Sequence, residues 1–320
     1  MTILSKNPSK CFTLAGVCRR SIDILVSTVR FFQSVSMIRL GIAAVFSIAV
    51  APARSDPNLA MTSSAFASSW SKQTGGVGEM RLIAAGRSKG LYDAAVEIKI
   101  APSAVTYWRD PGAAGVPPQF SFAGSENVAS AQVLYPAPNR LDEGGIEAFG
   151  YRGGVTFPIR VKLRDATKPS RLDLSLDYAV CDRICVPAKG HAELLLPQSG
   201  DSPERVVIAA AEARVPVMLP STAVDKVAIH VTTTDKLKPR WSLVWKGTMP
   251  VSDLFVEGPD GWAFETHKTA KNTFSLTAVA TPAMPAPGPG PVSVSVHLTL
   301  TGPDKAYEFI APLAVAKAEK

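Results

Sequence analysis

Cysteine is scarce in this chain, with four among 320 residues. Cys11 and Cys18 lie near the amino terminus, which leaves Cys181 and Cys185, with three residues between them, in the body of the chain. Histidine is equally scarce, and the three histidines of the last hundred residues stand singly, without the spacing of metal ligands. These three histidines are therefore not expected to bind a metal, and we predict no cofactor.

Long apolar runs are missing after the first 53 residues, where no run reaches the ~18 residues that a membrane-crossing helix needs. Segments with helical periodicity are short as well. A thioredoxin-type site has two residues between its cysteines and a helix after them. These absences disfavour a membrane-embedded domain in this region and an α/β thioredoxin-like fold.

A strong basic patch is also missing from the body of the chain, although the formal net charge is +7. Residues 1–53 hold six of the 34 basic residues and one of the 27 acidic ones, so the remainder is close to neutral. No basic stripe with interleaved aromatic residues stands out there. Nucleic-acid binding is therefore not expected.

The basic start has the pattern of a secretory leader, with its core over 37–53. Arg39 precedes the apolar stretch Leu40–Val50, and an A-x-A sequence ends at Ala53. About eleven apolar residues are too few for a membrane anchor, which needs about 20. We expect cleavage near Ala53 and an exported product that keeps only the later cysteine pair, in an oxidising compartment.

Short strand-like runs recur from Glu79 onward between turn signals, which is typical of an antiparallel β-sandwich. Ser202 and Pro203 then open a short predicted helix that ends near Arg214, and further strands follow. We predict an all-β chain, with an antiparallel β-sandwich followed by a second, smaller one. The predicted segments are a leader (1–53), a flexible tail (54–74), a first sandwich (75–200), a helical linker (201–221) and a second sandwich (222–320).

The later cysteines fall at the turn of a predicted hairpin. Arg171–Val180 alternates apolar and polar residues, and a short apolar run follows the turn. Paired strands place Cα atoms ~4.5–5.5 Å apart, a distance that a disulfide can bridge. A three-residue loop removes little entropy from the unfolded chain when it is closed, so an exchangeable disulfide is favoured over a staple. An inert structural disulfide remains open, as does Cu(I) binding by Cys181, Cys185 and His191.

Charged residues near the pair act in opposite directions. Arg183, Lys189 and His191 favour a thiolate, whereas Asp182 opposes it. The sequence leaves the net sign open.

Two insertions interrupt the strand pattern. Asp110–Pro118 is a stiff Pro/Gly loop, and Pro136–Gly154 is a longer, glycine-rich segment that includes Ile146, Phe149 and Tyr151. A mobile loop with a few apolar residues is typical of a lid over a reactive site, although an ordinary surface loop has the same composition.

Four motifs together carry a family resemblance. They are Tyr107-Trp108 with its P-G loop, Q-V-L-Y-P-A-P (132–138), D-E followed by G-Y-R-G-G-V-T-F-P-I (150–159), and Y-A-V-C-D-R-I-C-V-P (178–187). The stretch 75–200 resembles the periplasmic amino-terminal domain of the disulfide reductase DsbD, in the branch of the copper-sensitivity suppressor ScsB. The resemblance implies an immunoglobulin-like domain whose cysteines receive electrons from a membrane partner and pass them to periplasmic acceptors.

The resemblance also implies roles for particular residues. Cys181 and Cys185 match the redox pair, and Cys185 would form the mixed disulfide with partners. Asp142 and Glu143 match the acidic pair of a cap loop that shields the sulfurs, and Tyr107 matches an aromatic residue near them.

One departure concerns the cap. Gly144 stands where the family has an aromatic residue, so shielding would pass to Ile146 or Phe149. Tyr151, Asp182 and Arg183 are expected in the surroundings of the site.

The resemblance implies partners as well. Because no membrane domain or thioredoxin module follows the leader, we expect a protein-disulfide reductase-type electron carrier whose donor is a separate membrane-embedded reductase. Expected acceptors are periplasmic thioredoxin-like proteins or isomerases, including those of cytochrome c maturation and copper stress. The alternative is a non-catalytic exported β-sandwich that binds a partner and contains an inert disulfide.

Overall fold

The computed structural model describes residues 65–88, 90–220, 226–233, 238–282 and 292–315. The predicted leader, its two cysteines and its cleavage near Ala53 lie outside these residues. Within them, none of the helices has the length and apolar character required to cross a membrane.

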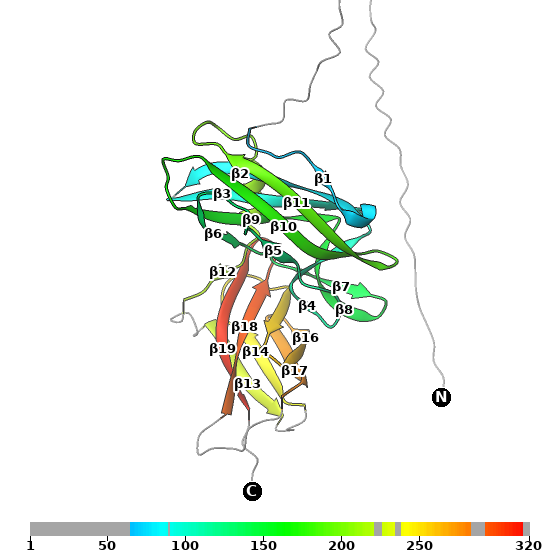
Figure 1. Ribbon diagram of the computed structural model, residues 1–320. Helices are drawn as coiled ribbons and strands as arrows, with labels where there is room; N and C mark the ends of the chain where they lie inside the picture. Colours follow the sequence, from blue (N-terminus) through cyan, green and yellow to red (C-terminus); the bar gives the residue numbers. More distant parts are fainter. Residues whose placement is uncertain (1–64, 89, 221–225, 234–237, 283–291, 316–320) are drawn as a thin grey trace, which may run out of the picture. The chain divides into compact units, whose positions relative to one another are not determined.

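The first sandwich consists of two sheets in which every pair of neighbouring strands is antiparallel (Figure 1). One sheet has the order β1 (Ser71–Lys72), β2 (Gly78–Ser88), β3 (Leu91–Ile100), β9 (Gly154–Leu163) and β6 (Val128–Val133). The other has the order β11 (Cys185–Leu196), β10 (Ser170–Cys181), β4 (Val105–Gly112), β8 (Ile146–Arg152) and β7 (Asn139–Glu143), and β5 (Gln119–Ser121) pairs with β10.

Strand β10 shows how the sequence pattern becomes the core of this sandwich. Leu172, Leu174 and Leu176 are fully buried, and Tyr178 and Val180 are nearly so. These residues occupy alternate positions, so all five side chains project from one face of the strand. The predicted half-buried strand is confirmed.

The second sandwich consists of two four-stranded sheets. One contains β12 (Val217–Met218), β19 (Ala306–Val315), β18 (Val292–Thr301) and β15 (Asp253–Glu257), and the other contains β13 (Val227–Thr233), β14 (Arg240–Trp245), β17 (Thr273–Ala280) and β16 (Ala263–Ala270). Its core is formed by buried side chains such as Trp241, Leu243 and Phe274. The prediction of an immunoglobulin-like sandwich followed by a second β-sandwich is confirmed.

The helix α1 (Arg205–Glu212) lies between the strands of the two sandwiches in the chain. Its buried residues, Ile208 and Ala211, face the five-stranded sheet, where Ile208 joins a small apolar cluster with Ile83. Ser202 accepts a hydrogen bond from the backbone N–H of Glu204. The predicted short helix is present and begins slightly later than expected.

Two segments differ from the expectations. The long segment after Pro136 is not a loop: β7 and β8 form a hairpin, which we call the cap hairpin (139–152). Gly144 and Gly145 make its two-residue turn with φ of 67° and 89°, so these glycines supply a tight turn rather than mobility. The tail expected over 54–74 is packed from Phe66 onward, because Phe66 and Ala67 are buried and pair their backbone with β2.

Buried tyrosines predict a loss of stability in alkali. Burial raises the pKa of Tyr92 to about 12 and also raises the pKa values of Tyr151 and Tyr178. Because tyrosines of the unfolded chain ionise near pH 10, their contribution to the free energy of unfolding should be constant below about pH 10 and fall above it, by up to ~1.4 kcal/mol per pH unit for each tyrosine. Urea unfolding at about pH 9 and about pH 11 measures this fall, and Tyr178→Phe should reduce it. Equal stability at both pH values would contradict the prediction.

Candidate redox-active disulfide site

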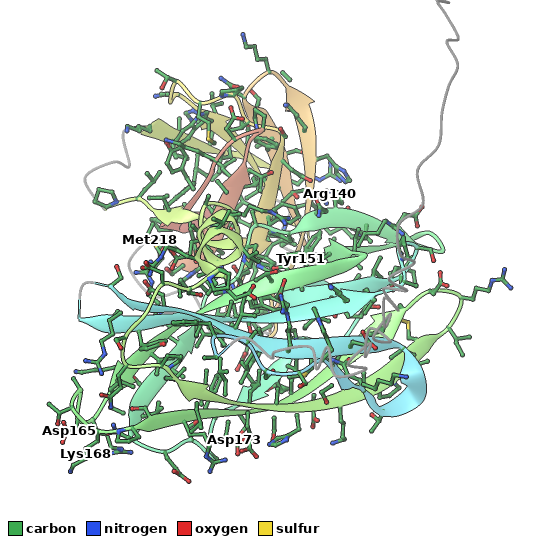
Figure 2. All side chains as sticks on the ribbon, turned by 90° about the horizontal axis from the view of Figure 1, so that it is seen from above. Arg140, Tyr151, Asp165, Lys168, Asp173 and Met218 are labelled. Atoms are coloured by element: carbon green, nitrogen blue, oxygen red, sulfur yellow. A yellow bond between two sulfur atoms is a disulfide. The ribbon has the colours of Figure 1, made fainter. Side chains whose placement is uncertain are left out.

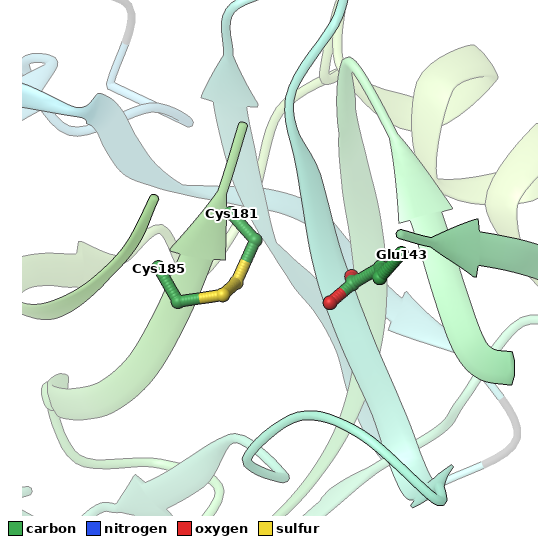
Figure 3. A group of neighbouring side chains, drawn as sticks. All are labelled: Glu143, Cys181 and Cys185. Carbon is green, nitrogen blue, oxygen red and sulfur yellow. A yellow bond between two sulfur atoms is a disulfide. The ribbon is translucent and has the colours of Figure 1, made fainter. Parts of the chain in front are cut away.

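The site is at the tip of the hairpin formed by β10 and β11. These strands pair without a register shift from Ser170 opposite Leu196 to Cys181 opposite Cys185. The cysteines form a disulfide, and their Cα atoms are 4.0 Å apart (Figure 3). Asp182, Arg183 and Ile184 close the turn. The predicted hairpin and the predicted position of the cysteines at its turn are confirmed.

The two sulfurs have different surroundings. Cys181 is only 4% exposed, because its backbone pairs with Val105 of β4 and its side chain lies in a small apolar cluster with Leu141 and Ala148. Cys185 is exposed at the start of β11. An incoming thiolate can therefore reach Cys185 from solvent, whereas Cys181 is shielded.

Tyr107 of β4 connects the disulfide to the cap hairpin. Its hydroxyl lies 2.6 Å from the Cys181 sulfur, 3.7 Å from the Cys185 sulfur and 2.8 Å from a carboxylate oxygen of Glu143. Burial and the neighbouring Glu143 raise the pKa of Tyr107, so the phenol keeps its proton at neutral pH. The single hydroxyl proton therefore has two competing acceptors, the Glu143 carboxylate and the Cys181 sulfur.

Glu143 reaches this position because it is the last residue of β7, at the tip of the cap hairpin. Figure 3 shows its carboxylate facing the disulfide. Asp142 lies beside it in sequence but accepts a hydrogen bond of 2.6 Å from the backbone N–H of Gly145, which stabilises the turn. Of the predicted acidic pair, the structure places Glu143 at the tyrosine and Asp142 at the turn.

Phe149 and Tyr151 do not lie at the sulfurs, which corrects the expectation that they belong to the site. They are two residues apart on β8, so they share the face that packs in the main core, whereas Ala148 on the opposite face joins the cluster around Cys181. The Tyr151 hydroxyl donates to the carbonyl of Pro136 over 2.7 Å. Phe149 stacks edge-on against Phe255.

The turn and a neighbouring loop each contribute one residue, Ile184 and Gly115, that the sequence did not indicate as part of the site. Ile184, between the cysteines, is 73% exposed, and Asp182 and Arg183 are exposed beside it. Gly115 lies against the Tyr107 ring so closely that an added Cβ would be 2.4 Å from a ring carbon. The glycine in the P-G loop was visible in the sequence, but its closeness to Tyr107 depends on the fold.

The basic residues after the turn are engaged elsewhere. Lys189 pairs with Asp177 at 2.9 Å, and His191 lies 3.0 Å from Asp173. His191 pairs with Ser175 in the strand ladder, six residues along from the cysteines and therefore ~20 Å away. The Cu(I) site considered from the sequence, with Cys181, Cys185 and His191, is not assembled.

A carboxylate takes the place of that histidine beside the sulfurs. Ligand atoms of Glu143, Cys181 and Cys185 lie within 4.8 Å of one another. Thiolates are the form of cysteine that binds a metal, so this set would become available only after the disulfide is reduced.

Comparisons with known proteins agree with this geometry. The family model described as "Thiol:disulfide interchange protein DsbD, N-terminal" matches residues 81–197. The crystal structure of the N-terminal periplasmic domain of ScsB from Proteus mirabilis has a TM-score of 0.57 and 21% identity, and the match covers 76% of this chain and 98% of that one. A protein of unknown function from Porphyromonas gingivalis W83 has a TM-score of 0.18 and 12% identity, and the match covers 70% of this chain and 92% of that one. No curated protein matches the sequence.

The family match contains the disulfide, Tyr107 and the cap hairpin, and the similarity to the ScsB domain extends to the fold of a larger part of the chain. The resemblance inferred from the sequence motifs is confirmed. Residues 81–197 match the amino-terminal domain of DsbD, and the chain is similar in fold to the periplasmic domain of ScsB.

Proposed function

We propose that this protein relays electrons between other proteins by reversible opening of the Cys181–Cys185 disulfide. The observation that carries the proposal is the asymmetry of the pair: Cys185 is an exposed residue, whereas Cys181 is buried with its sulfur beside a tyrosine hydroxyl. Thiol–disulfide exchange needs a sulfur that can be attacked and a second sulfur that can leave as a thiolate. The pair provides both.

The reaction begins when a donor thiolate attacks the Cys185 sulfur. A bond forms between the donor and Cys185, the disulfide breaks, and Cys181 leaves as a thiolate. A second donor thiol then resolves the mixed disulfide, so that two electrons and two protons have entered the pair and the donor has become a disulfide. The same steps in reverse, with Cys185 attacking an acceptor disulfide and Cys181 resolving it, return the pair to its oxidised form.

Tyr107 and Glu143 regulate this opening in opposite directions. The Tyr107 hydroxyl stabilises the departing Cys181 thiolate by donating a hydrogen bond to it. Glu143 competes for the same proton, and its negative charge opposes both an incoming thiolate and the thiolate that forms. The cap hairpin in the observed position therefore restrains the disulfide, and a partner that displaces Glu143 releases it.

The partners and the compartment are part of the proposal. The matched ScsB domain is periplasmic by name, and we propose that this chain is likewise exported, with cleavage near Ala53. A membrane-embedded reductase would be the donor, and periplasmic thioredoxin-like proteins or isomerases would be the acceptors. Exposed Ile184, adjacent to Cys185, offers such partners an apolar contact.

The reduction potential of the disulfide tests the proposal. We expect a value above about −300 mV, because structural disulfides of secreted proteins lie below that value. Equilibration with dithiothreitol or glutathione buffers, followed by trapping of free thiols, measures it. A lower potential, together with no exchange with any thioredoxin-fold protein, would support an inert structural disulfide instead.

A further inference from the structure

The cap hairpin is held differently at its two ends. At the tip, Gly144 and Gly145 have no atoms within 4 Å of an added Cβ, and Ile146 is 51% exposed. The contact between Glu143 and Tyr107 attaches this open tip to the site. β7 is also an edge strand, paired only with β8 in the described sheet. The position of Glu143 therefore depends on what fixes the base of β7.

Arg140, which is labelled in Figure 2, attaches the base of β7 to the second sandwich. Its guanidinium donates to both carboxylate oxygens of Asp253, over 3.0 and 2.7 Å. It also donates to the carbonyl of Leu254 over 3.1 Å and to the hydroxyl of buried Thr266 over 2.8 Å. Glu147 of the cap hairpin forms a further ion pair with it. Two parallel hydrogen bonds between a guanidinium and a carboxylate fix the relative orientation of the two groups as well as their distance.

Apolar contacts surround this ion pair. The Arg140 guanidinium lies 5.3 Å from the Phe149 ring centre and 5.4 Å from that of Phe255, and the two rings are 4.9 Å apart, edge to face. Although burial opposes the charge, Asp253 and Glu147 raise the pKa of Arg140, so it remains a cation. The contact thus joins β7 to the strand β15 of the second sandwich through a group that keeps its charge.

We propose that Arg140 is a positioning residue of the redox site, and that the second sandwich acts through it as a clamp on the cap hairpin. Arg140 is three residues before Glu143, ~10 Å along the strand. With its base fixed, the hairpin keeps the Glu143 carboxylate against Tyr107 and so keeps the disulfide restrained. The inference depends on the proposed function and gives the second sandwich a part in it.

Two carboxylates of β15 provide a matched test. Asp253 and Glu257 each accept two hydrogen bonds from one arginine. The arginine at Glu257 is Arg109 of β4, which lies outside the cap hairpin. Each arginine also keeps a second carboxylate, Glu147 or Glu308. Asp253→Asn and Glu257→Gln are therefore equivalent losses of charge on the same strand, and of the two carboxylates only Asp253 binds an arginine of the hairpin.

We expect Asp253→Asn to increase the rate constant for reduction by dithiothreitol by about tenfold, which corresponds to about 1.4 kcal/mol of lost restraint. Glu257→Gln should leave the rate constant unchanged. Arg140→Lys keeps the positive charge but cannot donate two parallel hydrogen bonds to one carboxylate. Its rate constant for reduction should therefore lie between those of the wild type and Arg140→Met. Equal rates for the two carboxylate variants, whether raised or not, would overturn the inference.

A double-substitution cycle separates positioning from general loosening. If the clamp acts through the Glu143 charge, Asp253→Asn should have no further effect on the rate in a Glu143→Gln background. Additive effects of the two substitutions would contradict the proposal.

Amide hydrogen exchange distinguishes failure of the inference from failure of the proposed function. In the oxidised protein, amides 142–146 should exchange faster in Asp253→Asn than in Glu257→Gln, whether or not the disulfide has physiological partners. Unchanged amide exchange would contradict the proposed clamp without affecting the proposed electron relay. Faster amide exchange in a protein whose disulfide is inert would support the clamp and contradict the proposed electron relay.

Discussion

Cys181→Ser should convert the protein into a form that stays covalently bound to its partners. The substitution leaves the exposed Cys185 free to attack an acceptor disulfide but removes the sulfur that resolves the product. We therefore expect mixed disulfides through Cys185 to accumulate, while complete exchange is abolished. Incubation with an oxidised thioredoxin-fold protein and non-reducing electrophoresis measures this accumulation.

The matched variant is Cys185→Ser, which removes the same disulfide. Its remaining sulfur is that of Cys181, which is 4% exposed, so it should form few or no mixed disulfides. Comparable trapping by the two variants would show that the difference in exposure does not govern the reaction. Identification of the trapped proteins would name the partners.

Tyr107→Phe should slow reduction of the disulfide by about tenfold to a hundredfold, because a hydrogen bond to a charged group contributes about 1.5–3 kcal/mol. The substitution removes the donor that stabilises the departing Cys181 thiolate and keeps the buried ring. Glu143→Gln should have the opposite effect, since a neutral amide oxygen competes more weakly than a carboxylate for the hydroxyl proton and the repelling charge is gone. Stopped-flow reduction by dithiothreitol measures both rates.

Tyr178→Phe is the control for this experiment. Tyr178 is a buried tyrosine of the same sandwich, three residues before Cys181, and its hydroxyl has no hydrogen-bond partner among the described residues. Its removal should leave the reduction rate unchanged. If Tyr107→Phe also reacts at the wild-type rate, the tyrosine hydroxyl does not assist the opening of the disulfide.

Much of the fold follows from the alternation of apolar and polar residues and from the turn residues in the sequence. The alternation along Arg171–Val180 predicted both the strand and its buried face, and turn signals separated the other strands. The same signals were misread at the cap hairpin. Gly144-Gly145 is a hairpin turn signal, but the surrounding glycines gave the segment the composition of a loop.

The site was predicted only in part because its contacts are non-local. Tyr107 and Cys181 are far apart in sequence and meet because β4 and β10 are neighbours in one sheet. The difference between Glu143 and Asp142, and between Ala148 and Phe149, is one residue of strand register, which composition does not reveal. The ion pair of Arg140 with Asp253 joins the two sandwiches, and no local pattern indicates it.

The uninterrupted ladder between β10 and β11 has a consequence for the reduced protein. Twelve residue pairs align these strands up to the cysteines themselves, so the backbone keeps the two thiols as neighbours when no bond joins them. Closure of the ring is then intramolecular and competes well with any outside thiol, since positioned groups react as if at very high concentration. Each encounter should therefore end in transfer of a full electron pair, and covalent complexes with the native protein should be short-lived.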